Sequence, residues 1–107
     1  MEAITALSDP TRQRIVEMLA GKELSAGAIA SRFDMSAPAV SQHLKVLKDA
    51  KLVSVRADAQ KRIYSLNRDG FEEMGDWLER IRRYWIKNLD RLEQILRDED
   101  KAAKRKK

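Results

Sequence analysis

Two short amphipathic segments, each preceded by a serine, lie only three residues apart in the chain. Ser25 can cap a helix that runs to Phe33, and Ser36 can cap a second helix that runs to Ala50, because a serine oxygen accepts a hydrogen bond from the free N–H groups of a first turn. Residues 34–36, "DMS", have the length of a tight turn. Two helices joined so closely form a helix-turn-helix, and the rest of the fold has to be built around it.

Two further helices are predicted ahead of this unit. Residues 1–7 form a short apolar segment, and a longer helix should run from Pro10 to about Ala20, with Ser8 or Asp9 as its cap. The apolar residues that share one face of each helix recur at helical spacing: Ala3, Ile4 and Leu7 on the first helix, Ile15, Met18 and Leu19 on the second, Ile29, Ala30 and Phe33 on the third, and Val40, Leu44 and Leu47 on the fourth.

Residues 53–66 change from helical to alternating periodicity, which predicts a hairpin. Val53, Val55, Ile63 and Ser65 are expected to share one face, and residues 57–60 are expected to form the bend. The bend contains no glycine, so Asp58 is the residue predicted to take a positive φ.

The last segment predicts one long helix over about residues 69–98. Asp69 with Glu72 resembles a capping box, and apolar residues recur at spacings of three and four: Phe71, Met74, Leu78, Ile81, Trp85, Leu89, Leu92 and Leu96. The predicted fold is therefore mainly α with a small β-hairpin (α+β), a winged helix-turn-helix domain over residues 1–100 with a long C-terminal dimerisation helix.

Charge is strongly segregated along the 107 residues. Residues 36–68 hold seven Lys and Arg against two Asp, whereas residues 69–100 hold six against ten acidic residues. Such a basic middle favours a local surface for a polyanion. Residues 101–107, "KAAKRKK", carry the whole net charge of +5 and are expected to be a disordered basic tail.

Composition excludes several classes of protein. Cysteine is absent, which removes disulfides, thiolate metal sites and cysteine nucleophiles. The single histidine, His43, has neither a nucleophile nor a glycine-rich phosphate loop beside it, so neither an enzyme nor a cofactor is expected. Neither a long apolar run nor a secretory signal is visible, and the expectation is a cytoplasmic protein without a membrane segment.

The chain resembles the ArsR/SmtB family of bacterial transcriptional repressors. The resemblance rests on "LSDPTRQRIVEML" at 7–19, "LSAGAIASRFDMSAPAVSQHLKVLKDAKLV" at 24–53 and "RIYSL" at 62–66. The segment "WLERIRRYWIKNLDRLEQIL" at 77–96 further resembles a cysteine-free subgroup of that family. Metal-sensing members carry a thiol pair where this chain has Ser25 and Gly27, so the resemblance does not extend to a metal site.

The second helix of the predicted pair has a polar face opposite its apolar stripe, and for an isolated helix this would be an ordinary solvated surface. Within a helix-turn-helix it has the geometry of a recognition helix. Gln42 can pair with adenine, Ser41 with several base edges, and Ala37 or Pro38 can touch a thymine methyl, while Lys45 and Lys48 suit phosphates. The predicted DNA-binding residues are Ser36, Ala37, Pro38, Ser41, Gln42, His43, Lys45 and Lys48 on the helix, with Arg56, Lys61 and Arg62 as a basic wing at the hairpin tip. His43 is expected to be a half-buried packing residue bonded to backbone or phosphate.

The long helix leaves two readings open. Its large apolar side chains can serve core and dimer packing, or they can line an effector pocket between two subunits. The predicted dimerisation residues are Ile4, Leu7, Ile81, Trp85, Leu89, Leu92 and Leu96, and the possible pocket residues are Trp77, Tyr84 and Trp85.

Together these features predict a homodimeric, sequence-specific regulator, most simply a repressor, whose partners are double-stranded DNA and a second copy of itself. Two alternatives remain at this stage. One is a protein-interaction module that uses the aromatic C-terminal helix, and the other is a sequence-indifferent nucleoid-type DNA binder. The effector is unknown.

Overall fold

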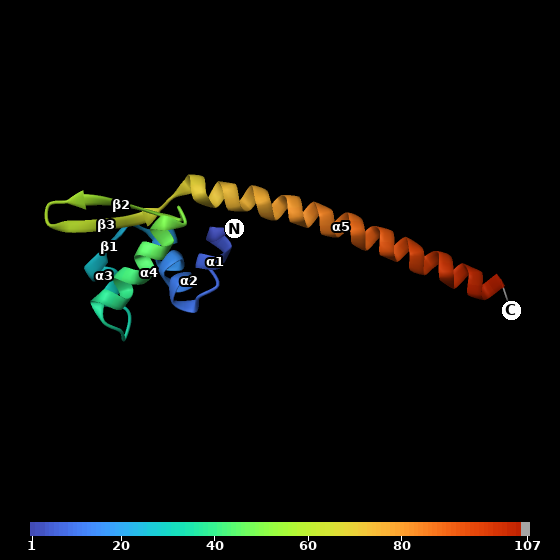
Figure 1. The fold of residues 1–107 in the computed structure, drawn as a ribbon, viewed down its shortest axis with the longest axis horizontal. Helices are drawn as coiled ribbons and strands as arrows, with labels where there is room; N and C mark the ends of the chain where they lie inside the picture. The colour runs from blue at the N-terminus through green and yellow to red at the C-terminus, as the bar shows by residue number, and fades with distance from the viewer. Residues whose placement is uncertain (106–107) are drawn as a thin grey trace. The chain divides into compact units, whose positions relative to one another are not determined.

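A computed structural model describes residues 1–105, with side chains as far as Ala103. The chain forms two compact units, one spanning Met1–Met74 and one beginning at Gly75. The elements follow the order shown in Figure 1: α1 (Glu2–Ala6), α2 (Pro10–Gly21), β1 (Leu24–Ser25), α3 (Ala26–Ala30), α4 (Ala37–Asp49), β2 (Val53–Asp58), β3 (Lys61–Leu66) and α5 (Arg68–Arg105).

Three of the predicted helix caps are confirmed. The backbone N–H of Arg12 donates to Oδ2 of Asp9 over 3.0 Å, and the N–H of Ala28 donates to Oγ of Ser25 over 3.1 Å. Ser36 caps α4 through the N–H of Ala39, at 3.3 Å. Each short polar side chain satisfies a donor that a helix leaves free, which is why the helices begin where the sequence placed them.

Helix α3 is shorter than predicted, ending at Ala30 and not at Phe33. Beyond it the backbone tightens, because Arg32 and Phe33 donate to carbonyls three residues back. The hydroxyl of Ser31 also donates to the Ala28 carbonyl over 2.8 Å. Such local bonds compete with a continuing α-helix, so the connection from α3 to α4 is longer than the three residues expected.

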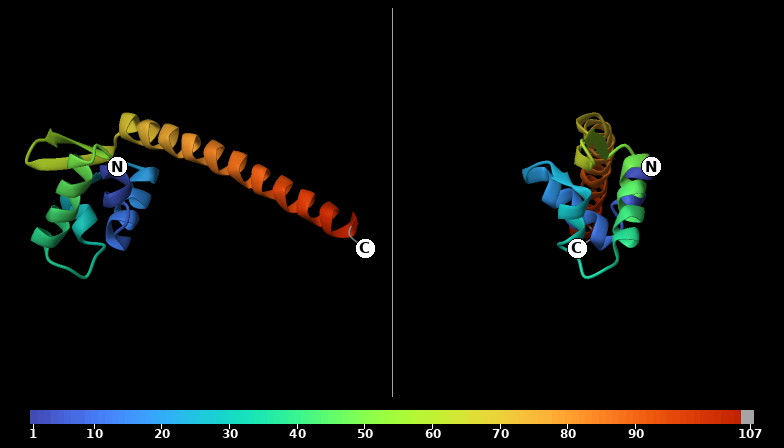
Figure 2. Two further views of the ribbon diagram at one scale, coloured as in Figure 1. Left: turned by 45° about the vertical axis from the view of Figure 1, so that its right-hand side comes forward. Right: turned by 90° about the vertical axis from the view of Figure 1, so that its left-hand side faces the viewer.

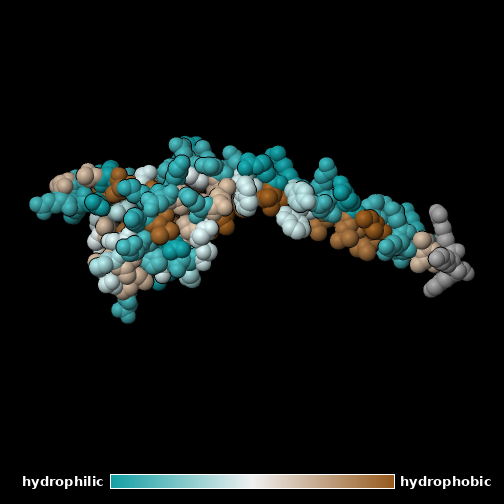
Figure 3. Space-filling view, viewed as in Figure 1, coloured by the Kyte–Doolittle hydropathy of each residue, from teal (hydrophilic) through white to brown (hydrophobic). Residues whose placement is uncertain are grey.

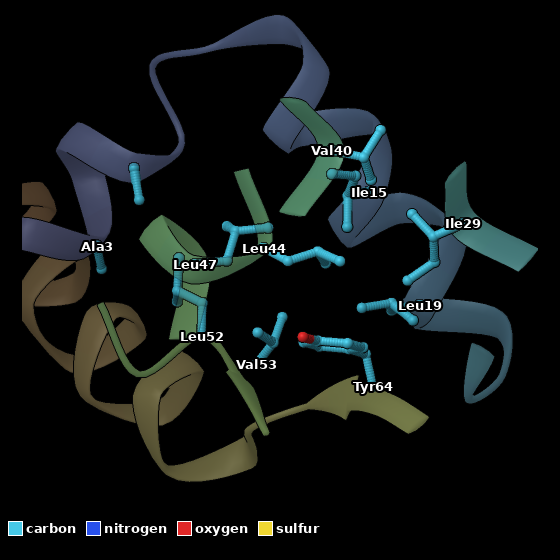
Figure 4. Packing of buried hydrophobic residues seen from close by; sticks show 11 residues of the cluster. Ala3, Ile15, Leu19, Ile29, Val40, Leu44, Leu47, Leu52, Val53 and Tyr64 are labelled. Carbon is cyan, nitrogen blue, oxygen red and sulfur yellow. The ribbon is translucent and has the colours of Figure 1, made fainter. Parts of the chain in front are cut away.

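The first unit is built around one hydrophobic core. In Figure 4 the side chains of Ile15, Leu19, Leu44, Val53 and Tyr64 converge from helices and sheet. The stripe of α4 predicted from its spacing is confirmed: Val40 and Leu44 are 1% exposed and Leu47 is 0% exposed. The full buried set is Ala3, Ala6, Ile15, Leu19, Ile29, Val40, Leu44, Leu47, Leu52, Val53 and Tyr64.

The hairpin forms as predicted, but the residues of its second strand that face the core are the even-numbered ones, and not the odd-numbered ones expected from the sequence. Its register pairs Val55 with Tyr64 and Val53 with Leu66, so Tyr64 and Leu66 share the core face, and not Ile63 and Ser65. The cause is the even number of residues in the turn at 59–60, because such a turn pairs odd-numbered residues of one strand with even-numbered residues of the other.

The sheet also contains a strand that the sequence did not predict. Two residues, Leu24 and Ser25, pair with Tyr64 and Ile63 and give the order β1-β3-β2. In both orientations of Figure 2 the hairpin runs along one side of helices α1–α4. The positive φ in its turn belongs to Ala59, at 57°, and not to Asp58 as predicted.

The start of α5 is fixed by a close backbone approach. A Cβ added to Gly70 would lie 1.8 Å from the carbonyl oxygen of Lys51, and Lys51 itself has a φ of 64°. The predicted capping box of Asp69 is replaced by Asn67, whose Oδ1 accepts from the Asp69 N–H at 3.1 Å. Gly70 is therefore the residue that lets α5 begin against the loop after α4.

Helix α5 extends further than predicted. It continues to Arg105, so residues 101–105, which were expected to be disordered, are helical, and residues 106–107 lie outside the described residues. Figure 3 shows hydrophobic side chains gathered along one side of this helix. None of the helices in the described chain is long and apolar enough to cross a membrane.

Candidate nucleic-acid interface

The outer face of α4 gathers the side chains that the sequence predicted for base and phosphate contacts. Val40, Leu44 and Leu47 of this helix are buried in the core, so the positions on its opposite side are turned to solvent. The predicted residues that are exposed on this face or at its start are Ser36, Ala37, Pro38, Ser41, Gln42, Lys45 and Lys48. They offer hydroxyl groups, one carboxamide, two ammonium groups and small apolar contacts, which is the chemistry of groove and phosphate recognition.

His43 lies apart from that face and is half-buried. Its Nδ1 is 3.3 Å from Nη1 of Arg12 and 3.8 Å from Oδ2 of Asp9, both at the start of α2. The sequence identified Asp9 as a possible cap, but nothing in the spacing pointed to Arg12 as a partner 31 positions away. His43 is half-buried, as predicted. Its partners, however, are the side chains of Arg12 and Asp9, and not the backbone or phosphate expected from the sequence.

The carboxylate of Asp9 is stabilised where it lies. The hydrogen bond from the backbone N–H of Arg12 is the largest cause that lowers the pKa of Asp9 below its ordinary 3.8, and the charge of Arg12 adds to it. Asp9 therefore remains an anion beside Arg12 and His43 at neutral pH.

The three cations predicted for the wing do not form one cluster. Arg56 lies across from Ile63, and Lys61 is two residues before Ile63, so Arg56 and Lys61 share one face of the sheet. Arg62 pairs with Ala57 and lies on the other face. Lys61 and Arg62 are exposed near the turn, where they line a shallow hollow together with Gln60 of the turn and with Ser25, Ala26 and Gly27 at the start of α3.

Arg56 already has a partner within the chain. Its Nη2 lies 2.8 Å from Oε2 of Glu23, and the hydrogen bond and charge of Glu23 raise the pKa of Arg56. Glu23 immediately precedes β1, the strand that the sequence did not predict, so this ion pair could not be foreseen from spacing. Arg56 is thus an exposed but paired cation, whereas Lys61 and Arg62 form no ion pair within the part of the chain that the structure describes.

The residues predicted for dimerisation differ in exposure. Trp85 is 59% exposed and Leu89 57%, whereas Leu7 packs partly against the core of the first unit. Ile81 is half-buried, and the other exposed members of the set are Ile4, Leu92 and Leu96.

The aromatic residues of the predicted effector pocket lie close together along α5. The rings of Tyr84 and Trp85 meet edge to face, with centroids 6.3 Å apart, and Trp77, half-buried, lies two turns before Tyr84. The pocket stays a prediction, because it requires a second subunit. The described residues hold no group of three or more His, Asp or Glu side chains suited to a metal ion.

Known proteins resemble the chain in sequence and in fold. The helix-turn-helix domain family matches residues 7–56. The HTH-type transcriptional regulator Rv2034 of Mycobacterium tuberculosis is 42% identical over 88% of this chain and 85% of its own. Transcriptional repressor SdpR of Bacillus subtilis is 40% identical over 68% of this chain and 81% of its own. Among solved structures, an ArsR-like transcriptional regulator from Rhodococcus sp. RHA1 superposes with a TM-score of 0.76 at 30% identity, covering 88% of this chain and 89% of that one.

Proposed function

Since this chain belongs to the ArsR-type family of winged helix-turn-helix transcriptional regulators, we propose that it is a homodimeric repressor that occupies a pseudo-palindromic DNA site. The observation that carries the proposal is the outer face of α4, where seven predicted contact residues are exposed on or beside one helix face. A homodimer presents this face twice, and two recognition helices roughly 34–36 Å apart fit successive major grooves.

Within each half-site we assign base contacts and phosphate contacts to different side chains. Gln42 and Ser41 read base edges through their polar atoms, and Ala37 and Pro38 offer only apolar contact. Lys45 and Lys48 lie further along α4 and neutralise phosphates. Ala37 brings only a methyl group to the reading face, so part of the specificity comes from DNA shape.

The wing supplies a second contact through Lys61 and Arg62. Both are exposed beside the turn, where a cation meets phosphates or enters a minor groove. Arg56 contributes less than predicted from sequence, because its guanidinium is bound to Glu23.

The dimer forms through the apolar stripe of α5, and Ile4 and Leu7 near the N-terminus contribute further apolar surface to it. Four large side chains of that stripe are more than half exposed in the single chain: Trp85, Leu89, Leu92 and Leu96. Monomeric proteins rarely leave so continuous an apolar surface in water, and a two-fold partner buries it symmetrically. Trp77, Tyr84 and Trp85 then lie where an apolar effector could enter. A protein of this kind acts on the chromosome in the cytoplasm.

Selection of DNA from a random pool by the purified protein tests the proposal. An enriched inverted repeat with half-sites about one helical turn apart would support it, as would a specific affinity ~10³–10⁷ above that for random DNA. Tight binding without any enriched sequence would identify a nucleoid-type protein, and no DNA binding would point to a protein-interaction module.

A further inference from the structure

One guanidinium in this domain joins three helices. The Nε of Arg12 donates to the carbonyl oxygen of Ala6, the last residue of α1, over 2.6 Å. The Nη1 of the same side chain lies 3.3 Å from Nδ1 of His43 on α4. Arg12 itself is in the first turn of α2, where its N–H binds Asp9. The ends of α1 and α2 and the middle of α4 therefore meet at a single side chain.

The chemistry of the contact fixes which atom donates. A guanidinium is always protonated and has no acceptor, so Nδ1 of His43 must be the acceptor and its proton must be on Nε2. Arginine suits this role because its planar fork can bind two acceptors at once in a fixed geometry. A lysine at position 12 would keep the charge but not the fork.

Helix α4 has few other directional links. In the part of the chain that the structure describes, the contact between Arg12 and His43 is the only side-chain hydrogen bond that joins α4 to another helix. Apart from the longer contact of His43 Nδ1 with Asp9 Oδ2, at 3.8 Å, the attachment of α4 to the core is hydrophobic, through Val40, Leu44 and Leu47. Burial of apolar surface is not directional, so it holds α4 against the core without defining its rotation as sharply as a hydrogen bond does.

We propose that Arg12 is a positioning residue for DNA recognition, which sets the rotation of α4 about its own axis through His43. His43 directly follows Gln42, so a rotation at His43 moves the reading face by the same angle. The inference rests on the proposed function. It means that Arg12 affects which DNA sequence the protein prefers, although Arg12 itself does not contact DNA.

Three single variants and one double variant test the proposal. Arg12→Lys keeps the charge and loses the fork, and His43→Leu removes the acceptor without touching the bond to Ala6. Each should lower the ratio of specific to random-sequence affinity by roughly tenfold, the range of one hydrogen bond to a charged group. His43→Asn retains an acceptor near the position of Nδ1 and should restore most of the ratio. The double variant, Arg12→Lys with His43→Leu, should lose no more than either single change.

A second measurement needs no DNA. Residual dipolar couplings of the free protein report the orientation of α4 relative to α2, and they should change in Arg12→Lys and His43→Leu but not in His43→Asn. Unchanged couplings in the first two variants, or equal losses of affinity on specific and random DNA, would overturn the proposal. If the unaltered protein shows no sequence preference, the proposed function fails, while the couplings still decide whether Arg12 orients α4.

Discussion

Arg56 on β2 reaches across the neighbouring strand β3 to bind Glu23, with 2.8 Å between Nη2 and Oε2. The register places Arg56 beside Ile63 and Ile63 beside Ser25, so the side chain crosses the outer face of the sheet. Both partners are about half exposed, and an exposed pair of this kind contributes only about 0–1 kcal/mol to stability. We expect Glu23 to have a larger effect on which cations of the wing can contact DNA.

We therefore expect Glu23→Gln to tighten binding to DNA of any sequence. Releasing Arg56 adds one cation to the wing, which should steepen the dependence of log K on log salt by roughly one unit. The control is Glu17→Gln, which removes an exposed carboxylate from α2 without releasing an arginine. Titrations at several salt concentrations decide the matter, and equal slopes for the two variants would show that Arg56 stays off the DNA.

Gln42→Ala should relax base preference at one position of each half-site. The side chain is exposed on α4, and a paired contact of carboxamide with adenine is worth ~1–3 kcal/mol of discrimination. Selection experiments with both proteins measure this directly. Equal losses on specific and random DNA would mean that Gln42 touches only the backbone.

The lowered pKa of Asp9 predicts a pH-dependent contribution to stability. A carboxyl group whose pKa is lower in the folded than in the unfolded state stabilises the fold above its ordinary value of 3.8, and this stabilisation is lost as the pH falls through the lower folded value. Asp9→Asn keeps an N-cap acceptor and removes the titration. Thermal melts should therefore show a smaller difference between pH 7 and pH 3 for the variant, and an identical pH dependence would contradict the assignment.

Gly70→Ala should destabilise the protein by ~1–3 kcal/mol, the usual range for overpacking. The new methyl group would overlap the Lys51 carbonyl oxygen, and neither backbone can yield without moving the start of α5. Gly75→Ala is the matched control, because nothing lies within 4 Å of its added Cβ and alanine favours a helix by ~0.5–1 kcal/mol. Denaturant unfolding of both variants should give shifts of opposite sign.

The parts of this fold that were predicted correctly depend on neighbours in the sequence. The caps at Asp9, Ser25 and Ser36 and the stripe of α4 follow from spacing within one or two turns. The face of β3 was assigned wrongly because odd-numbered residues of both strands were expected to share a face, whereas a turn of even length, whether residues 57–60 or 59–60, pairs odd-numbered with even-numbered residues.

The long-range partners were not predictable from the sequence. Arg12 with His43 and Arg56 with Glu23 are 31 and 33 positions apart, and each depends on how elements pack in three dimensions. Gly70 carried no visible signal either, since glycine near a helix start has several uses. The exposed face of α4 could be predicted because it follows from the periodicity of that helix alone. The contacts that hold α4 and the wing in place could not, because they join residues far apart in the sequence.

The last prediction concerns assembly, on which binding to a palindrome depends. Trp85, Leu89, Leu92 and Leu96 are 51–59% exposed in the single chain, and full burial of such a side chain contributes ~1.5–3 kcal/mol. We expect a stable homodimer that Leu89→Glu or Trp85→Glu splits, with loss of tight DNA binding although neither residue contacts DNA. Lys87→Gln makes the same change of net charge about 200° around the helix from Leu89 and should leave the dimer intact. Sedimentation at micromolar concentration measures all four proteins: a monomeric parent chain, or a Leu89→Glu variant that is still dimeric and tight on DNA, would rule out dimerisation through this stripe.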